Sequence, residues 1–130
     1  MILGFLIGGA GRDILIGGAG ADKLNSASVS GSDFGDDLLI GGRTSYGFQK
    51  PFVDAILAAW SSSDSYIARI QNISMTGVGS NKQFKINSTT VLDDLAIDTL
   101  FGGGGLDWFL VATTGLYKDT HDAGIGEIGR

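Results

Sequence analysis

A repeat of nine residues constrains the fold of this chain more than any other feature. Residues 8–16 read GGAGRDILI, residues 17–25 read GGAGADKLN, and residues 102–110 read GGGGLDWFL. Glycines at places one, two and four permit backbone angles that a side chain forbids. The aspartate at place six suits a turn, and the last three places are extended, with a large apolar residue in the middle. Because so short a strand is not stable alone, the units must stack on one another.

Other parts of the chain match the repeat incompletely. Residues 32–40 follow the second unit after a six-residue insertion and keep its glycine, aspartate and apolar residue at places four, six and eight. Residues 41–46 reopen the pattern with two glycines but have tyrosine at place six, and residues 93–101 match only the second half. Phe5–Ile7 resembles the end of a further unit. We therefore expect the chain to begin within a repeat and to be a fragment of a longer protein.

The composition favours turns that bind a cation and argues against several other classes of function. Glycine accounts for 22 of the 130 residues, and every acidic residue except Glu127 is an aspartate. Aspartate is favoured where a carboxylate must reach a group close to its own backbone, as in turns and calcium loops. The net charge of −5 argues against nucleic-acid binding. No apolar run is long enough to span a membrane, and the absence of cysteine excludes a disulfide framework.

The units resemble the RTX, or haemolysin-type, calcium-binding nonapeptide repeat, G-G-x-G-x-D-x-U-x with a large apolar residue at U. The resemblance implies a mainly β fold, a right-handed parallel β-roll (a solenoid) with a small helical insertion or cap. Two nonapeptides would make one coil of the roll, and Ca²⁺ would lie between neighbouring turns along two edges.

The resemblance also implies which turns meet. The turn at residues 8–13 is expected to face the turn that contains Gly35 and Asp37, and the turn at residues 17–22 to face the turn at residues 41–46. If the interruption is looped out, Asp98 is expected to join the first of these edges and Asp107 the second. The residues carried over as metal-binding are Gly8, Gly9, Gly11, Asp13, Gly17, Gly18, Gly20, Asp22, Asp33, Gly35, Asp37, Asp98, Gly102, Gly103, Gly105 and Asp107.

Residues 47–92 interrupt the repeats with a different period. Pro51 suits the first position of a helix, and residues 82–92 alternate polar with apolar side chains and predict a strand. We interpret the segment as a cap or insertion that covers apolar surface of the repeats; in the alternative, Trp60 and Tyr66 contact another partner. Apolar residues at helical spacing predict two short helices, the first with Phe52, Val53, Ile56, Leu57 and Trp60 and the second with Tyr66, Ile67, Ile70 and Ile73.

The same segment also resembles one found beside RTX repeats at the C-terminus of large secreted bacterial proteins. The residues that carry this resemblance are Trp60, Ser63, Asp64, Tyr66 and Arg69, followed by Thr90–Asp94 and Asp107–Phe109.

Motifs for other chemistry are missing from the sequence. The glycine-rich start does not complete the dinucleotide fingerprint, because Ile14 stands where glycine or alanine is needed. His121 is the single histidine, and a zinc site draws on several His or Cys ligands. Asp93 and Asp94 are interpreted as turn residues rather than an acid–base pair. We therefore expect the chain not to be an enzyme.

The expected organisation is a single domain over residues 1–130. It contains β-roll repeats at residues 5–46 and 93–111, the insertion at 47–92 and a polar tail at 112–130. The expected function is a calcium-binding module that folds on binding calcium outside a bacterial cell, and so stabilises or aids export of a larger secreted protein. Its partners would be calcium ions and the rest of the parent chain. The alternative is an adhesion module that presents residues 47–92 to a cell-surface partner.

Overall fold

Two parallel sheets contain the repeat units. The computed structural model of the chain describes residues 5–7, 11–26, 35–87, 89–92, 96–110, 120–121 and 128–129. Sheet A has the order β1-β3-β7-β9, and sheet B has the order β10-β8-β4-β2. The strands of sheet A are β1 (Phe5–Ile7), β3 (Lys23–Asn25), β7 (Thr99–Phe101) and β9 (Thr120–His121), and those of sheet B are β2 (Ile14–Ile16), β4 (Leu38–Ile40), β8 (Trp108–Leu110) and β10 (Ile128–Gly129).

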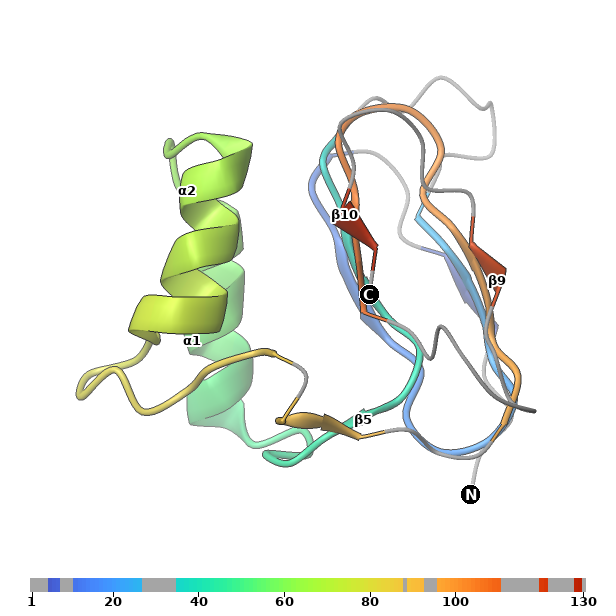
Figure 1. Cartoon of the computed structure of the whole chain (residues 1–130), viewed down its shortest axis with the longest axis horizontal. Helices are drawn as coiled ribbons and strands as arrows, with labels where there is room; N and C mark the ends of the chain where they lie inside the picture. Colours follow the sequence, from blue (N-terminus) through green and yellow to red (C-terminus); the bar gives the residue numbers. More distant parts are fainter. Residues whose placement is uncertain are drawn as a thin grey trace.

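Strands that follow one another in the repeats alternate between the two sheets, which face each other (Figure 1). The strands β2, β3, β4, β7 and β8 each occupy the last three places of a repeat unit. The register matches place with place: Ile14 pairs with Leu38, which pairs with Trp108. The predicted stacking of units is therefore present, although the units are far apart in the sequence.

The middle residues of the strands fill the space between the sheets. Leu15, Leu39 and Phe109 from sheet B meet Leu24 and Leu100 from sheet A in one buried cluster. Each of these side chains is 5% exposed or less. The prediction that place eight forms an apolar core is confirmed, because alternation along a strand turns this place inward and its two neighbours outward.

A helical segment follows β4 and the short strand β5 (Arg43–Thr44) in the chain. It consists of α1 (Lys50–Trp60), α2 (Tyr66–Gln71) and a π-helix, η1 (Asn72–Thr76). Pro51 lies in the first turn of α1, as predicted. The side chain of Ser65 caps α2 by accepting a hydrogen bond from the amide of Ala68 at 3.2 Å. Within the described ranges, no helix has the length and apolar character that crossing a membrane requires.

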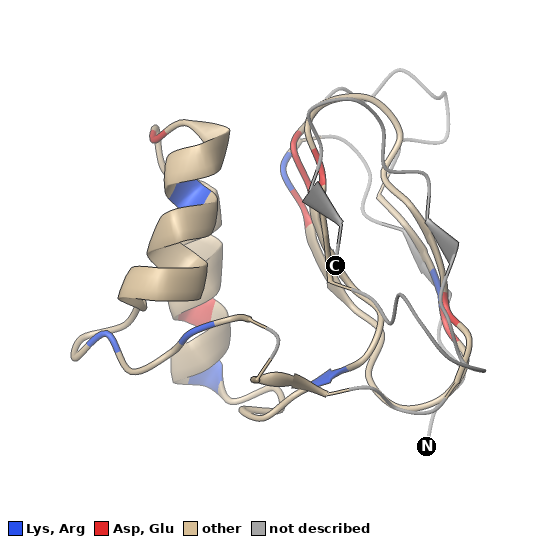
Figure 2. Cartoon of the chain, viewed as in Figure 1, with Lys and Arg blue, Asp and Glu red and all other residues tan. Residues whose placement is uncertain are grey.

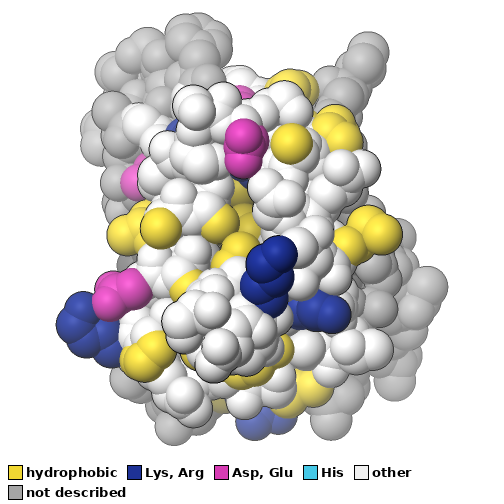
Figure 3. Space-filling view, turned by 90° about the vertical axis from the view of Figure 1, so that its left-hand side faces the viewer, with side chains coloured by type: hydrophobic (Ala, Val, Ile, Leu, Met, Phe, Trp, Pro, Cys, Tyr) yellow, Lys and Arg dark blue, Asp and Glu magenta, His cyan; other side chains and the backbone are white. Residues whose placement is uncertain are grey.

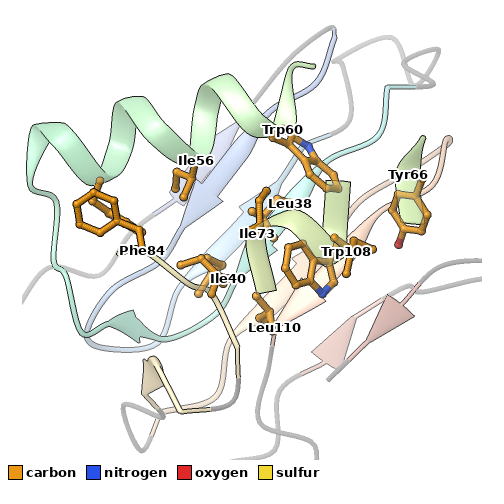
Figure 4. Close-up of a cluster of buried hydrophobic side chains, with 12 residues drawn as sticks. Leu38, Ile40, Ile56, Trp60, Tyr66, Ile73, Phe84, Trp108 and Leu110 are labelled. Atoms are coloured by element: carbon orange, nitrogen blue, oxygen red, sulfur yellow. The ribbon is translucent and has the colours of Figure 1, made fainter. Parts of the chain in front are cut away.

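The helical segment covers the outer face of sheet B. Phe52, Ile56 and Trp60 of α1 are buried against outward-facing residues of the sheet such as Leu38 and Trp108 (Figure 4). The prediction that the segment covers apolar surface of the repeats is confirmed, although it lies over a side of the sheet rather than its end. Further members of this core are Ile40, Tyr66, Ile70, Ile73, Phe84, Ile86 and Leu110.

Burial of the aromatic residues bears on the adhesion alternative. Trp60 is 0% exposed and Tyr66 is 6% exposed. Neither ring is available to another partner, which counts against the alternative as stated. The outer face of the helices shows other hydrophobic side chains among a few charged ones (Figure 3). Leu57 of α1 and Ile67 of α2 are exposed. These two were predicted to lie on the packed faces of the helices, and the structure places them outside.

The predicted strand at residues 82–92 is mostly wrong. Among the residues described there, which leave out residue 88, only β6 (Val91–Leu92) is a strand, and it pairs antiparallel with β5 (Arg43–Thr44). A single bridge joins Val78 to Phe84. The alternating apolar residues Phe84 and Ile86 are buried in the core beneath the helices instead. The short β5–β6 ladder therefore brings the beginning and end of the insertion together at its base.

The prediction of a mainly β chain folded as a right-handed parallel β-roll is wrong. In the described residues, sheets A and B are small and separate and a third sheet is antiparallel. The helices hold nearly as many residues as the strands. The physical reason is the insertion, whose core against sheet B is larger than the core between the sheets. The repeat pattern predicted the strands of the repeat units but not the layer of helices that packs on sheet B.

Candidate metal centre

Three sixth-place aspartates form a row along sheet B. Asp13, Asp37 and Asp107 immediately precede β2, β4 and β8. The backbone amide of Asp13 donates a hydrogen bond to Oδ1 of Asp37 at 2.8 Å. The amide of Asp37 donates in the same way to Oδ1 of Asp107 at 2.8 Å. We call these three residues row B; the carboxylates of Asp37 and Asp107 each reach toward the turn of the neighbouring unit.

A second row lies at the beginning of the strands of sheet A. The amide of Asp22 donates to Oδ1 of Asp98 at 2.7 Å. The carbonyl of Asp22 accepts a hydrogen bond from the amide of Thr99 at 2.9 Å, which continues the ladder between β3 and β7. We call Asp22 and Asp98 row A. The acidic residues of the repeats thus gather at two opposite ends of the sheets, as Figure 2 shows.

The aspartates of both rows are withdrawn from solvent. Asp37, Asp98 and Asp107 are 0% exposed and Asp22 is 2% exposed, whereas Asp13 is half-buried. Burying ionised carboxylates is costly, and neighbouring like charges raise the cost. Each row is therefore a place where negative charge is concentrated in a poorly solvated environment.

First-place glycines lie directly over the carboxylates. A methyl group on Gly17 would stand 2.6 Å from Oδ2 of Asp22, and one on Gly102 would collide with Oδ2 of Asp107. Fourth-place glycines also allow close stacking, since a Cβ on Gly35 would collide with the carbonyl oxygen of Gly11. The sequence therefore needs glycine at these places for space around the carboxylates as well as for backbone freedom. Other predicted glycines adopt positive φ: Gly11, Gly18, Gly20, Gly103 and Gly105.

A comparison with protein families identifies these units. A model of the RTX calcium-binding nonapeptide repeat matches residues 5–28 and 94–110, in four copies. The chain carries RTX repeats. No curated protein and no solved structure matches it significantly. The family model passes over residues 32–40, yet the structure places β4 of this unit between the RTX strands β2 and β8.

RTX nonapeptide repeats bind Ca²⁺. They are generally structural rather than catalytic, and the proteins that carry them are typically secreted by bacteria. The donors in both rows are carboxylate and backbone carbonyl oxygens, which are the ligands that calcium prefers. Among the described residues, no three Asp, Glu, His or Cys side chains gather as a metal cluster.

The RTX units meet partly as predicted. The turn that ends at Asp13 does face the turn of Gly35 and Asp37. The assignment of the last two aspartates is wrong, because Asp107 joins row B and Asp98 joins row A. Three predicted ligands, Gly8, Gly9 and Asp33, lie outside the described residues, as do Asp93 and Asp94.

The wrong assignment of Asp98 and Asp107 to the two edges has a structural cause, because the helical segment divides one RTX unit into two parts. The second unit begins beside Gly41–Gly42, since the amide of Gly18 donates to the carbonyl of Gly42 at 3.0 Å. The same unit ends beside Asp98 and β7. Residues 41–42 and 98–101 are therefore the two ends of one unit, and the helical segment is inserted between them. Tyr46 belongs to this insertion, where its ring contacts Phe52 and Phe84.

Outward-facing residues carried a signal for the correct assignment. Units of sheet B have apolar residues at places seven and nine, because these places face the helical core. In sheet A, β3 has Lys23 and Asn25 there and β7 has Thr99 at place seven, whereas Phe101 of β7 and Phe5 and Ile7 of β1 are apolar. Trp108 and Leu110 of the last RTX unit therefore match the units of sheet B and differ from β3.

Proposed function

We propose that this chain is a calcium-dependent folding module in which rows A and B hold the ions. The observation that carries the proposal is the burial of neighbouring aspartate carboxylates in register along each sheet. RTX repeats bind calcium, and all of these aspartates except Asp37 occupy the sixth place of a unit that the RTX model matches. At the same turns, Gly17 and Gly102 keep a Cβ away from the carboxylates of Asp22 and Asp107.

The negative charge of the buried carboxylates would make folding depend on calcium. Without a cation, the carboxylates of Asp37 and Asp107 are held together in a buried row at an electrostatic cost. The glycine-rich turns also gain more backbone entropy on unfolding than ordinary turns. Calcium supplies positive charge and accepts oxygen ligands. Because the turns do not exist in the unfolded chain, the free energy of calcium binding becomes free energy of folding.

The remaining parts of the proposal follow from the RTX repeats. We place the module outside a bacterial cell, as part of a larger secreted protein whose effector activity lies elsewhere. Export of an unfolded chain followed by folding in a calcium-rich medium would suit such a switch. In this proposal the chain acts by folding and not by catalysis.

Calorimetric titration of the 130-residue chain tests the proposal. Calcium should bind to the unaltered chain, and magnesium should bind much more weakly. The double variant Asp37→Asn/Asp107→Asn should lose the calcium bound by row B, and Asp22→Asn/Asp98→Asn that bound by row A. Asp54→Asn is the matched control, because this carboxylate is exposed on α1 and pairs with Lys50. Equal calcium binding by the control and both double variants would refute the assignment.

A further inference from the structure

The fifth-place residues of sheet B contact the corner between α1 and α2. Arg12 stands one residue before Asp13, and its Nη1 donates to the carbonyl of Ser62 at 2.7 Å and to that of Trp60 at 3.3 Å. The carbonyl of Trp60 lies at the C-terminal end of α1 and that of Ser62 lies two residues beyond it, where the negative end of the helix dipole favours a cation. A variable place of the repeat is therefore used to hold the helical segment.

Asp36, in the next unit, makes a buried ion pair with the same corner. Its Oδ2 lies 2.6 Å from Nη2 of Arg69, whose side chain is 2% exposed. The Arg69 guanidinium also lies over the ring of Trp60, 4.5 Å from its centroid. The other carboxylate oxygen of Asp36 accepts a hydrogen bond from the amide of Leu106 at 2.8 Å. Asp36 thus connects the helices to two consecutive units of sheet B.

Two further hydrogen bonds reach the peptide groups of row B itself. Nε1 of Trp60 donates to the carbonyl of Asp36 at 2.9 Å. The amide of that same peptide group belongs to Asp37 and donates to the carboxylate of Asp107. The hydroxyl of Tyr66 donates to the carbonyl of Asp107 at 2.6 Å, in a buried position. Hydrogen bonds in series polarise one another, so the indole acts on the Asp107 carboxylate through one peptide group.

Row A lies on sheet A, which the helical segment does not cover. The helical segment lies on the far side of sheet B, away from sheet A (Figure 1). The outer face of sheet A bears the exposed Lys23 and Thr99. A change in how the helices dock should therefore reach row B directly and row A only through the whole fold.

We infer that Trp60, Tyr66 and Arg69 are positioning residues that set the calcium affinity of row B. Binding free energies are reciprocal, so calcium in row B must in turn stabilise the docked helices. The inference rests on the proposed function, because it needs calcium in row B. It adds that the two rows are unequal, with only row B coupled to the helical segment.

Two tyrosines allow a matched test. Tyr66→Phe removes the hydroxyl that reaches Asp107 and keeps the ring. Tyr46→Phe removes a hydroxyl that contacts Gln83 and Lys85, neither of which belongs to a row. Calcium affinity is measured for each in an Asp98→Asn background, which isolates row B, and in an Asp107→Asn background, which leaves row A intact. Tyr66→Phe should weaken calcium binding about threefold to tenfold in the first background only, and Tyr46→Phe in neither.

Tryptophan emission gives a second readout that does not depend on the Tyr66 variant. Trp60 and Trp108 are the two tryptophans of the chain and lie together in the core between helices and sheet B, with ring centroids 6.0 Å apart. The calcium-induced change in emission should persist in Asp98→Asn and be largely lost in Asp107→Asn.

The outcomes separate the inference from the proposed function. Calcium binding by the unaltered chain with Tyr66→Phe equal to Tyr46→Phe would overturn the inference and leave the proposed function standing. Equal weakening of both rows by Tyr66→Phe would also overturn it, because a general loss of stability explains that result. Failure of the unaltered chain to bind calcium would overturn both.

Discussion

The backbone amide of Asp37 donates a hydrogen bond of 2.8 Å to the carboxylate of Asp107, a residue 70 positions away in the sequence. The contact exists because β4 and β8 are neighbours in sheet B, on either side of the helical insertion in sequence. It joins a degenerate unit, which the RTX family model does not match, to a unit that it does match. Row B is therefore assembled from three separated parts of the chain.

Asp107→Asn tests the charge of this contact separately from its hydrogen bond. The amide oxygen of asparagine still accepts from the amide of Asp37, but the buried charge is gone. The calcium concentration at half-saturation of row B should rise about tenfold or more, because affinity depends on the number of charged ligands. Without calcium, the free energy of unfolding should not fall, since a costly buried charge has been removed. Urea unfolding with and without calcium measures both effects.

Asp54→Asn is the control for that experiment. Its carboxylate is exposed and pairs with Lys50 on the surface of α1, where such pairs contribute little. Neither the calcium midpoint nor the stability should change. A loss of calcium-free stability in Asp107→Asn that Asp54→Asn does not share would contradict the electrostatic account.

Gly102→Ala should damage row B by steric contact. The added methyl group collides with the Asp107 carboxylate, so the side chain must move and its calcium ligation should weaken. Overpacking of this kind costs about 1–3 kcal/mol of stability. Gly18→Ala is the comparison: its φ of 80° is strained for alanine, but no atom lies within 4 Å of the new Cβ. It should lose about 1–2 kcal/mol and retain the calcium affinity of row B. Calcium titration of both variants distinguishes the two effects.

Ile56→Ala tests the core between the helices and sheet B. Ile56 is 1% exposed and lies in this core, so the substitution should lower the free energy of unfolding by about 2–5 kcal/mol. Leu57→Ala, one residue along the same helix, removes a side chain that is 46% exposed and should cost about 0.5 kcal/mol. Chemical denaturation in saturating calcium gives both values. Similar losses for the two variants would show that α1 does not pack as described.

The sequence predicted the local parts of this structure because each depends on neighbouring residues. The glycine turns, the aspartates before the strands and the buried Leu15, Leu24 and Phe109 all follow from one nine-residue pattern. The two helices follow from apolar spacing and from Pro51.

How those parts are arranged relative to one another was harder to predict from the sequence. Which row receives Asp98 depends on whether residues 41–46 count as a complete unit, and the insertion makes them half of one. The mixed fold depends on the outward face of sheet B, where Leu38, Trp108 and their neighbours pack on helices. The role of Arg69 was hidden because its partner, Asp36, occupies a place that the repeat leaves variable.

Calcium titration of the unaltered chain, followed by far-UV circular dichroism with magnesium as the control, tests the central claim most directly. The account predicts a gain of ordered structure that is specific to calcium, is reversed by a chelator, and needs more calcium in Asp13→Ala and Asp37→Ala. A chain that is fully folded without calcium, and whose spectrum and stability calcium does not change, would contradict it.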